Sequence, residues 1–563
     1  MRSGPSTRPL VPGKPDGYCQ VVISRNRWRR RIRGVAAGLT VVVVAGLVSA
    51  GQLAGTPAAS AAPALDWEAC PAVHGVPASV RCATVEVPLD YRKPQGKTIE
   101  IGVSRMQARD QSRRRGVVMG NPGGPGGDGI AMFSQVPPPA AMLDEWDLVA
   151  VQPRGLVSGT PLRCEPITGD EPELMTALGK VNRDRCEART PGLGASLTTE
   201  NTARDMEVVR GLLGESKVSL YGISYGTLLM STYATLFPQR VDRMVLDSGF
   251  DPGLVWNTLL SAQTPGYKAR VHAMMAWIAR HDRIYGLGKT PLAVYRKWSD
   301  RVSAEAGVPP SLLAPPAQVG DVPPGLRAVA QQYIAGTDLT ADARARFENL
   351  MLTLLRPGSL QLTSQLLVLT RAFAPDRNSW PLVAQMTAKP GRKLPTPAPA
   401  VLEAAQVSQD MQAAVLCNEN RAPARPSLGF QAFVANYVTG DPFEAPGLAY
   451  ESGLACAGAP ALARPIEIRN RGLAVTPLQI QSVGDPQTPY RGALRMRSLM
   501  RSHLITVGGG DHAQLGRANK PLENAIVEYL RTGRTAVQRV PEAPITAPLT
   551  QLPPAFAAGT AGR

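Results

Sequence analysis

Short apolar runs alternate with longer amphipathic runs along much of the chain. The short runs, each bounded by turn-forming residues, predict buried strands at 116–120, 146–151, 218–222, 243–246, 478–483 and 504–507. Between them, apolar residues recur every three or four positions, as at 200–213 and 228–237, which is typical of helices with one buried face. Strands that alternate with helices indicate an α/β fold, with a mainly parallel sheet covered by helices on both faces.

This alternation is interrupted between residues 253 and 404, where helical spacing dominates. We therefore predict a sheet domain formed by 62–252 and 405–533, with a helical cap inserted between its two parts. A chain of 563 residues is longer than one compact core usually needs, which agrees with such an insertion. Residues 534–563 are rich in Pro, Ala and Thr, and we expect them to form a loose tail.

The first 61 residues have the order of a secretory signal. Arginines at 25–33 precede an apolar run at 34–50, and the small residues 59–61 then offer a cleavage site. Because the apolar run is short for a membrane span, we expect residues 1–61 to be removed and the mature protein to be secreted, without stable insertion in a membrane. An uncleaved membrane anchor is the alternative.

The net charge of +17 does not indicate a nucleic-acid partner, because much of it lies in this same segment. Residues 1–34 hold nine Lys or Arg residues and a single acid, so signal cleavage would remove about half of the excess. The remaining charge is spread over a long chain with both signs interspersed. We therefore expect no nucleic acid among the partners.

Six cysteines remain after the expected cleavage: Cys70, Cys82, Cys164, Cys186, Cys417 and Cys456. An even number in an exported chain suggests disulfides, and no two are spaced as the CxxC ligands of a metal. Pairing of sequence neighbours is one of the fifteen connectivities that six cysteines allow. No HExxH motif occurs, so neither a metal ion nor another cofactor is expected.

The most informative motif is Gly222-Ile223-Ser224-Tyr225-Gly226. It follows one predicted strand and precedes a predicted helix, which is the arrangement of a nucleophile elbow. Glycines permit the sharp turn, and the start of the helix places backbone N–H groups beside the reacting oxygen. We therefore predict that Ser224 is the nucleophile of a serine hydrolase.

A serine hydroxyl needs a base, and the base needs a carboxylate that orients it. His512 is the one histidine that directly follows a late predicted strand, on the glycine-rich loop 508–512. Asp485 follows the predicted strand 478–483 in the same way, which makes it the candidate acid. Asp511 is the alternative acid, but a sequence neighbour rarely aims its carboxylate at the far nitrogen of the imidazole. We expect Asp511 to be a solvated loop acid.

Two backbone N–H groups are expected to bind the oxyanion of the tetrahedral intermediate. One belongs to Tyr225, and the other to Gly123 or Gly124 in the glycine-rich loop 121–129. Three glycines of this loop also spell GxGxxG, the fingerprint of a dinucleotide site. The next predicted strand, however, ends without the acid that such a site requires. We therefore interpret the segment as an oxyanion loop.

Taken together, these motifs resemble the exported tripeptidyl aminopeptidases of actinobacteria, in the proline-iminopeptidase group of α/β-hydrolases. The resemblance runs from about residue 66 to residue 533 and rests on His512 and on the segments 87–91, 121–129, 222–227, 245–247 and 484–489. It implies an α/β-hydrolase fold, and it places Ser224, Asp485 and His512 on catalytic positions. Cys417 and Cys456 also match family positions.

The chain departs from the family pattern at three places. Gln152 stands where an Asp usually precedes Pro-Arg-Gly, and Asp128 replaces a usual Ser in the glycine-rich loop. The Trp that usually follows the last cysteine is absent after Cys456. None of these departures removes a candidate catalytic residue.

The resemblance implies a peptidase that acts on peptides with a free N-terminus and releases tripeptides. Such an enzyme needs an acid for the substrate ammonium group, and Glu419 is the candidate. A carboxylesterase on the same scaffold is the alternative, because a Ser-His-Asp triad cleaves esters and amides alike. A third interpretation is an inactive hydrolase that serves as a binding protein in the cell envelope.

Overall fold

A computed structural model describes residues 65–550, except 168–172, 357, 390, 392–396 and 545–546. The predicted signal segment, 1–61, and the end of the predicted tail lie outside the described residues. Among the residues that are described, no helix has both the length and the apolar character needed to cross a membrane.

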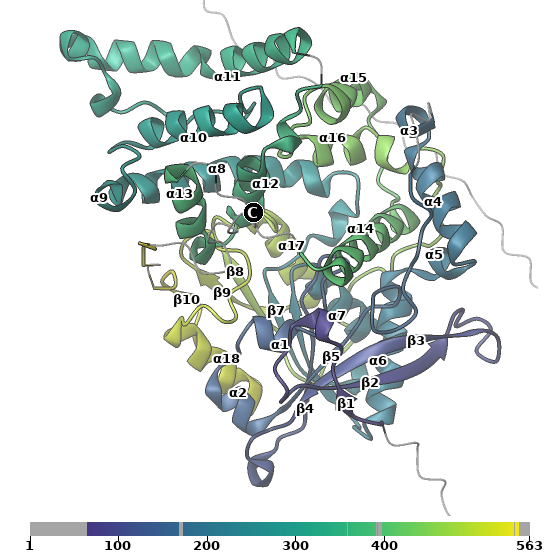
Figure 1. Ribbon diagram of the computed structural model, residues 1–563. Helices are drawn as coiled ribbons and strands as arrows, with labels where there is room; N and C mark the ends of the chain where they lie inside the picture. The colour runs from purple at the N-terminus through teal and green to yellow at the C-terminus, as the bar shows by residue number, and fades with distance from the viewer. Residues whose placement is uncertain are drawn as a thin grey trace, which may run out of the picture. The chain divides into compact units, whose positions relative to one another are not determined.

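The strands of the described residues form one ten-stranded sheet in the order β1-β2-β3-β5-β4-β6-β7-β8-β9-β10 (Figure 1). Their bounds are β1 Glu68–Ala69, β2 Arg81–Pro88, β3 Thr98–Met106, β4 Val117–Asn121, β5 Asp147–Val151, β6 Val218–Ile223, β7 Val241–Asp247, β8 Leu478–Ser482, β9 His503–Val507 and β10 Arg539–Val540. From β5 through β10 every pair is parallel, and β1, β2 and β3 extend the sheet antiparallel. The predicted α/β fold with a mainly parallel sheet is confirmed.

Helices cover both faces of this sheet. On one face, α6 (Thr199–Leu212), α7 (Tyr225–Leu236) and α17 (Tyr490–Met500) contribute to one apolar core. On the other, α1 (Met132–Gln135), α2 (Ala140–Glu145) and α18 (Lys520–Thr532) contribute to a second. All residues of β4, β5, β6 and β8 are buried, which agrees with the mainly apolar sequences of β4, β5 and β6. β8 differs because it also buries the polar residues Gln479, Gln481 and Ser482.

The cap lies between β7 and β8 and is helical, as Figure 1 shows above the sheet. Its helices are α8 Leu259–Arg280, α9 Asp282–Tyr285, α10 Pro291–Ala306, α11 Ala330–Leu355, α12 Gln365–Phe373, α13 Trp380–Ala388, α14 Pro399–Glu419, α15 Gly429–Phe433 and α16 Ala445–Glu451. The cap has an apolar core of its own, which includes Trp277, Trp298 and Trp380.

The helical segment continues past residue 404, where we expected the sheet domain to resume. α14 spans that boundary, and its residues Met411 and Val415 pack into the core on one face of the sheet. It is therefore a cap helix by position and a sheet-domain helix by packing. Three further short helices, α3 (Glu173–Thr176), α4 (Leu178–Arg189) and α5 (Leu193–Ser196), lie between β5 and α6.

Three disulfides join sequence neighbours: Cys70–Cys82, Cys164–Cys186 and Cys417–Cys456. The first links the segments of β1 and β2, and the second links the segment after β5 to α4. The third ties the end of α14 to the segment that follows α16. The expected disulfide framework is thus present, with the neighbour pairing among the fifteen possible ones.

The described part of the tail is not loose, which corrects our expectation for that segment. It adds β10 to the edge of the sheet beside β9. It then reaches the cap, where the backbone N–H of Leu549 donates to the Tyr285 hydroxyl at 3.1 Å and its carbonyl accepts from Gln385 Nε2 at 2.5 Å. Backbone pairing, which composition does not reveal, orders this Pro-rich segment.

Candidate active site

Ser224 occupies the turn between β6 and α7, with φ +58° and ψ −126°. A residue other than glycine adopts this backbone conformation only where its surroundings impose it. The Ser224 N–H donates to the Asp247 carbonyl at 3.0 Å, and side chains at Gly222 and Gly226 would clash with the backbone of Gly226 and Asn121. This packing explains why both glycines flank the serine, and it directs Ser224 to the carboxyl edge of the sheet.

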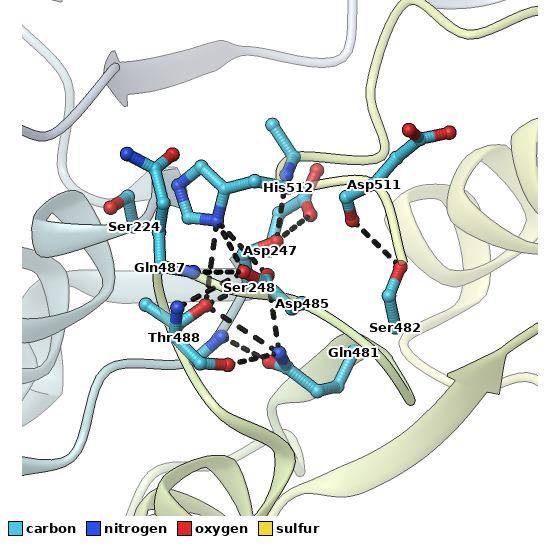
Figure 2. Close-up of polar contacts among 12 residues, drawn as sticks. Ser224, Asp247, Ser248, Gln481, Ser482, Asp485, Gln487, Thr488, Asp511 and His512 are labelled. Carbon is cyan, nitrogen blue, oxygen red and sulfur yellow. Dashed lines mark hydrogen bonds and ion pairs between the residues drawn. The ribbon is translucent and has the colours of Figure 1, made fainter. Parts of the chain in front are cut away.

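Asp485 and His512 follow β8 and β9 and meet at the same edge. His512 Nδ1 lies 3.0 Å from Asp485 Oδ1 and 2.9 Å from Oδ2. Figure 2 shows the imidazole between the Asp485 carboxylate and Ser224. The Asp485 side chain is fully buried and that of His512 is 11% exposed, so their hydrogen bond is sheltered from water.

The Asp485 carboxylate receives several donors besides His512. Thr488 donates from its N–H to Oδ1 at 3.0 Å and from Oγ1 to Oδ2 at 2.9 Å, and the Gln487 N–H donates to Oδ1 at 2.9 Å. Burial raises the pKa of Asp485, but the His512 imidazole and the Thr488 donors outweigh it, so the pKa lies below its usual range. The carboxylate therefore stays ionised and keeps a fixed orientation.

The loop that carries His512 is anchored to the end of β7. The Asp247 carboxylate accepts the backbone N–H groups of Gln514 and Leu515, each at 2.9 Å, and Ser248 Oγ accepts that of Ala513 at 2.8 Å (Figure 2). Asp247 is fully buried, and burial raises its pKa. Sequence reasoning used Asp247 only as part of the family motif 245–247 and missed this anchoring role.

Asp511 is not a solvated loop acid, so our expectation for it was wrong. It is 4% exposed, and its carboxylate lies 2.7 Å from Arg270 Nη2 and 2.8 Å from Arg377 Nε. Both arginines belong to the cap. Figure 2 shows the Asp511 side chain pointing away from the imidazole of His512.

The glycine-rich loop after β4 lies against the elbow. A Cβ on Gly123 would stand 2.9 Å from the Ser224 Cβ and 3.1 Å from the Tyr225 nitrogen, and the φ of Gly123 is +100°. The Gly123 N–H itself donates to Asn121 Oδ1 at 2.9 Å. The N–H of Gly124 is therefore the better candidate in this loop. The N–H of Tyr225 is the other, because the first residue of a helix has no partner within it.

The cap helix α14 covers this loop. Ser408 Oγ donates to the Gly126 carbonyl at 2.7 Å, and Gln412 Nε2 donates to that of Pro125 at 3.0 Å. A cavity of about 50 Å³ adjoins Ser224, and its other walls are Gly124, Pro125, Phe250, Trp256, Leu259, Leu260, Gln263, Gln412, Leu416, Gln487 and Thr488. The space beside the serine is thus small and mainly apolar, with a few amide groups.

Glu419 ends α14 and is 1% exposed. Its carboxylate accepts the Thr199 N–H at 2.6 Å and the Thr199 hydroxyl at 2.9 Å, at the first turn of α6. Burial raises its pKa to about 7. It is not among the residues that line the cavity beside Ser224. The carboxylate therefore caps the first turn of α6, and its predicted role as the partner of a substrate ammonium group stays a prediction.

A second row of serine, histidine and aspartate meets the end of the oxyanion loop. The buried His74 lies between Asp128 and Ser158, with 2.7 Å from Nδ1 to Asp128 Oδ2 and 2.5 Å from Nε2 to Ser158 Oγ. Gln152 Oε1 accepts the N–H of Gly129 at 2.6 Å in the same region. Two of the three departures from the family pattern, Asp128 and Gln152, thus help to hold this loop in place.

The comparisons with known proteins show the family to which the chain belongs. A family model described as "alpha/beta hydrolase fold" matches residues 116–327, and one described as "TAP-like protein" matches residues 443–540. The tripeptidyl aminopeptidase of Streptomyces lividans is 30% identical over 519 residues, which cover 86% of this chain and 87% of that protein. The chain belongs to the tripeptidyl aminopeptidase family of α/β-hydrolases.

Other members of this family, or close relatives of it, carry different names. Carboxylesterase B of Mycobacterium tuberculosis is 28% identical over 86% of this chain and 90% of that protein. Serine protease Hip1 of the same species is 32% identical over 33% of this chain and 40% of that protein. The tripeptidyl aminopeptidase family resemblance predicted from the motifs is confirmed, and the chain is a serine hydrolase of this fold.

Proposed function

We propose that this protein is an exported serine exopeptidase that releases tripeptides from the free N-terminus of peptides. The observation that carries the proposal is the His512 imidazole, which is held by the buried Asp485 carboxylate and faces Ser224 at the elbow. The name of a relative that matches 86% of the chain supports a peptide substrate. The three disulfides support export, because such bonds persist in oxidising compartments.

In the first half-reaction, Ser224 Oγ attacks the carbonyl carbon of the third peptide bond while His512 Nε2 accepts its proton. The Asp485 carboxylate accepts the Nδ1–H and stabilises the imidazolium that forms. The N–H groups of Tyr225 and Gly124 bind the oxyanion. His512 then donates its proton to the departing amine, and the C–N bond breaks, which leaves a tripeptidyl ester on Ser224.

In the second half-reaction, water attacks this ester. His512 accepts a proton from the water as the new C–O bond forms, and the same two N–H groups bind the second oxyanion. Collapse of the intermediate returns the proton to Ser224 Oγ and releases the tripeptide with a free carboxylate. The residues then regain their starting protonation states.

The volume of the cavity beside Ser224 limits which part of such a substrate can bind there. At about 50 Å³ it is far smaller than the roughly 300–1,000 Å³ of a typical small-molecule site. We therefore expect the cap walls that include Leu259 and Gln412 to move outward when a tripeptide unit binds. A cap that closes one end of the cleft would limit how much of the peptide lies on the acyl side, which accounts for cleavage near a terminus.

A carboxylesterase is the second candidate, and two observations favour it. Carboxylesterase B aligns over as much of the chain as the aminopeptidase does. Glu419, the acid that we expected to bind the substrate ammonium, already accepts two hydrogen bonds from Thr199. An ester with a small acyl group would fit the cavity without needing an ammonium partner.

Three substrates separate these functions: a tripeptide anilide, its N-acetylated form and a short acyl ester. For the peptidase, the free anilide should be cleaved at least about tenfold faster than the acetylated one, and the Ser224→Ala variant should cleave neither. The esterase would be established if the ester is cleaved much faster than either anilide and acetylation of the anilide makes no difference. If a fluorophosphonate does not label the folded wild-type protein at all, the binding-protein interpretation replaces both.

A further inference from the structure

A buried ionic cluster joins the cap to the residue that precedes His512. Besides its side-chain pairs with Arg270 and Arg377, the Asp511 carboxylate accepts the backbone N–H of Arg377 at 3.0 Å. Asp511, Arg270 and Arg377 are 4%, 6% and 8% exposed. Charges so far from water require close partners with good geometry, because an unpaired buried charge is strongly destabilising. The cluster therefore holds Asp511 at a defined place relative to the cap.

The two arginines belong to separate segments of the cap. Arg270 is part of α8, and its guanidinium lies 4.6 Å from the ring centre of Trp380 in the cap core. Arg377 begins a short 3₁₀ helix, Arg377–Ser379, just before α13. Asp511 is thus bound by two segments of the cap at once, both of them next to its apolar core.

The backbone of His512 is held by the same segment. Its N–H donates to the Pro375 carbonyl at 2.9 Å, and its own carbonyl accepts from Arg517 Nη2 at 2.6 Å. Arg517 in turn pairs with Asp376 at 2.6 Å. The histidine loop is therefore held between two supports, with residues 375–377 of the cap on one side and the end of β7 on the other.

We propose that Asp511 is a positioning residue through which the docked cap sets the place of the His512 imidazole. Asp485 fixes the rotation of the ring, but the position of its backbone depends on the contacts of the loop. A displacement of about 1 Å is enough to cost roughly a hundredfold in rate, because proton transfer needs hydrogen-bond geometry. The inference rests on the proposed function of His512 as the base, and it makes proton transfer at Ser224 dependent on the docked cap.

The charges of the cluster could also affect His512 through space, and this effect differs from positioning in its dependence on the sign of the charge removed. Besides Asp511, the cluster contains Glu542, which lies 2.8 Å from Arg377, and Asp376, which pairs with Arg517. His512 itself faces Asp485 and Asp247. If the charge of Asp511 mattered through space, its removal would make His512 less basic, and removal of Arg377 would make it more basic. A positioning role predicts that both removals act in the same direction.

The test compares Asp511→Asn, Arg377→Met and the double variant. For each we would measure the rate at which a fluorophosphonate labels Ser224, together with kcat and KM for whichever substrate the wild type turns over. We expect each single variant to lose about 10- to 100-fold in kcat and in labelling rate, with KM within about twofold. The double variant should be no slower than the slower single variant, because both remove the same link.

Asp205→Asn is the matched control. Asp205 is fully buried and pairs with Arg154, with 2.8 Å from Oδ2 to Nε, and its other side-chain donor is Tyr91; neither partner belongs to the candidate active site. It should lower the melting temperature by an amount similar to Asp511→Asn while kcat stays within about twofold. Arg377→Lys, which keeps the positive charge, should recover part of the loss and provides a milder variant if Arg377→Met does not fold.

The proposal is overturned if folded Asp511→Asn is labelled at the wild-type rate. It is also overturned if Asp511→Asn and Arg377→Met shift the pH dependence of activity in opposite directions without lowering the maximal rate. A wild-type protein that is neither labelled nor active would instead refute the proposed function itself, so the two failures are distinguishable.

Discussion

At Asp485, burial and hydrogen bonding act in opposite directions, and the donors prevail. Water is excluded from the carboxylate, which by itself would favour the protonated form. His512, Thr488 and Gln487 reverse this effect by supplying donors to both oxygens. The acid of the candidate triad is therefore ionised over the whole pH range in which a histidine can act as a base.

Thr488→Val tests how much of this depends on one hydroxyl. The substitution keeps the shape of the side chain and the backbone donor but removes the Oγ1 donor to Asp485 Oδ2. A hydrogen bond to a charged group contributes about 1.5–3 kcal/mol, so we expect kcat to fall roughly 10-fold or more. Thr232→Val is the control, since the Thr232 hydroxyl donates only to the Leu228 carbonyl within α7. Wild-type kcat in Thr488→Val would mean that the backbone donors suffice.

Glu419 has the opposite balance, because burial raises its pKa to about 7, above the value of about 4.3 in an unfolded chain. Between these two values the folded protein binds more protons, so its free energy of unfolding should decrease as pH rises from about 4.5 to 7. The decrease is on the order of 3 kcal/mol. Glu419→Gln cannot titrate and should not show it. Denaturant unfolding at pH 5 and pH 8 gives the free energy of unfolding of the wild type and of Glu419→Gln. An equal change in this free energy between the two pH values for both proteins would contradict the prediction.

At the scale of elements, the oxyanion loop derives its shape from supports outside itself. Asn121 binds the N–H of Gly123, α14 binds the carbonyls of Pro125 and Gly126, and His74 binds Asp128. The loop needs these supports because several of its residues have backbone conformations that only glycine adopts readily. A rigid loop keeps its N–H donors in place before the oxyanion forms, which is the condition for effective stabilisation.

Gly124→Ala should disrupt this preorganisation. The φ of Gly124 is +110°, and an added Cβ would lie 2.7 Å from the nitrogens of Gly126 and Gly127. Loss of one oxyanion donor typically costs 10²- to 10³-fold in kcat, and we expect a loss of about that size. Gly211→Ala, in α6, places its Cβ in open space and should leave kcat unchanged. Equal activity of the two variants would show that the oxyanion site does not depend on the backbone conformation of Gly124.

At the scale of the whole molecule, the cap and the sheet domain are joined at several distant points. α14 packs on the sheet domain, Asp511 binds the cap, and the tail runs from β10 to the Tyr285 hydroxyl. The disulfide Cys417–Cys456 adds a covalent link between the end of α14 and the segment that leads back to the sheet. Through these links, a shift of the cap would be transmitted to the loop that carries His512.

The disulfides also test the proposed export. Mass spectrometry of the secreted protein without reductant should find all six cysteines oxidised, in the pairs Cys70–Cys82, Cys164–Cys186 and Cys417–Cys456. Replacing Cys417 and Cys456 together by Ser should lower the free energy of unfolding by about 2–4 kcal/mol, because the unfolded chain gains freedom. Free thiols in the exported form would contradict the expected oxidising compartment.

The amino-acid sequence alone was enough to predict the fold class and to place Ser224, Asp485 and His512 on loops at the carboxyl ends of strands. Each of these inferences depends on residues that are close in sequence: a strand, a turn and the residue that the turn presents. Parallel strands bring their carboxyl ends to one edge, so the order of strands and loops was enough to predict that the three residues lie at the same edge of the sheet.

Only the tertiary structure decided what the neighbouring polar groups do. Asp511 became a buried link to the cap, Glu419 became a cap for α6, and the N–H of Gly123 was taken by Asn121. The physical reason is that a charge or a donor acquires its role from its partners. Arg270 and Arg377, which donate to Asp511, and Thr199, which donates to Glu419, lie more than 100 residues away along the chain, where no local pattern could reveal them.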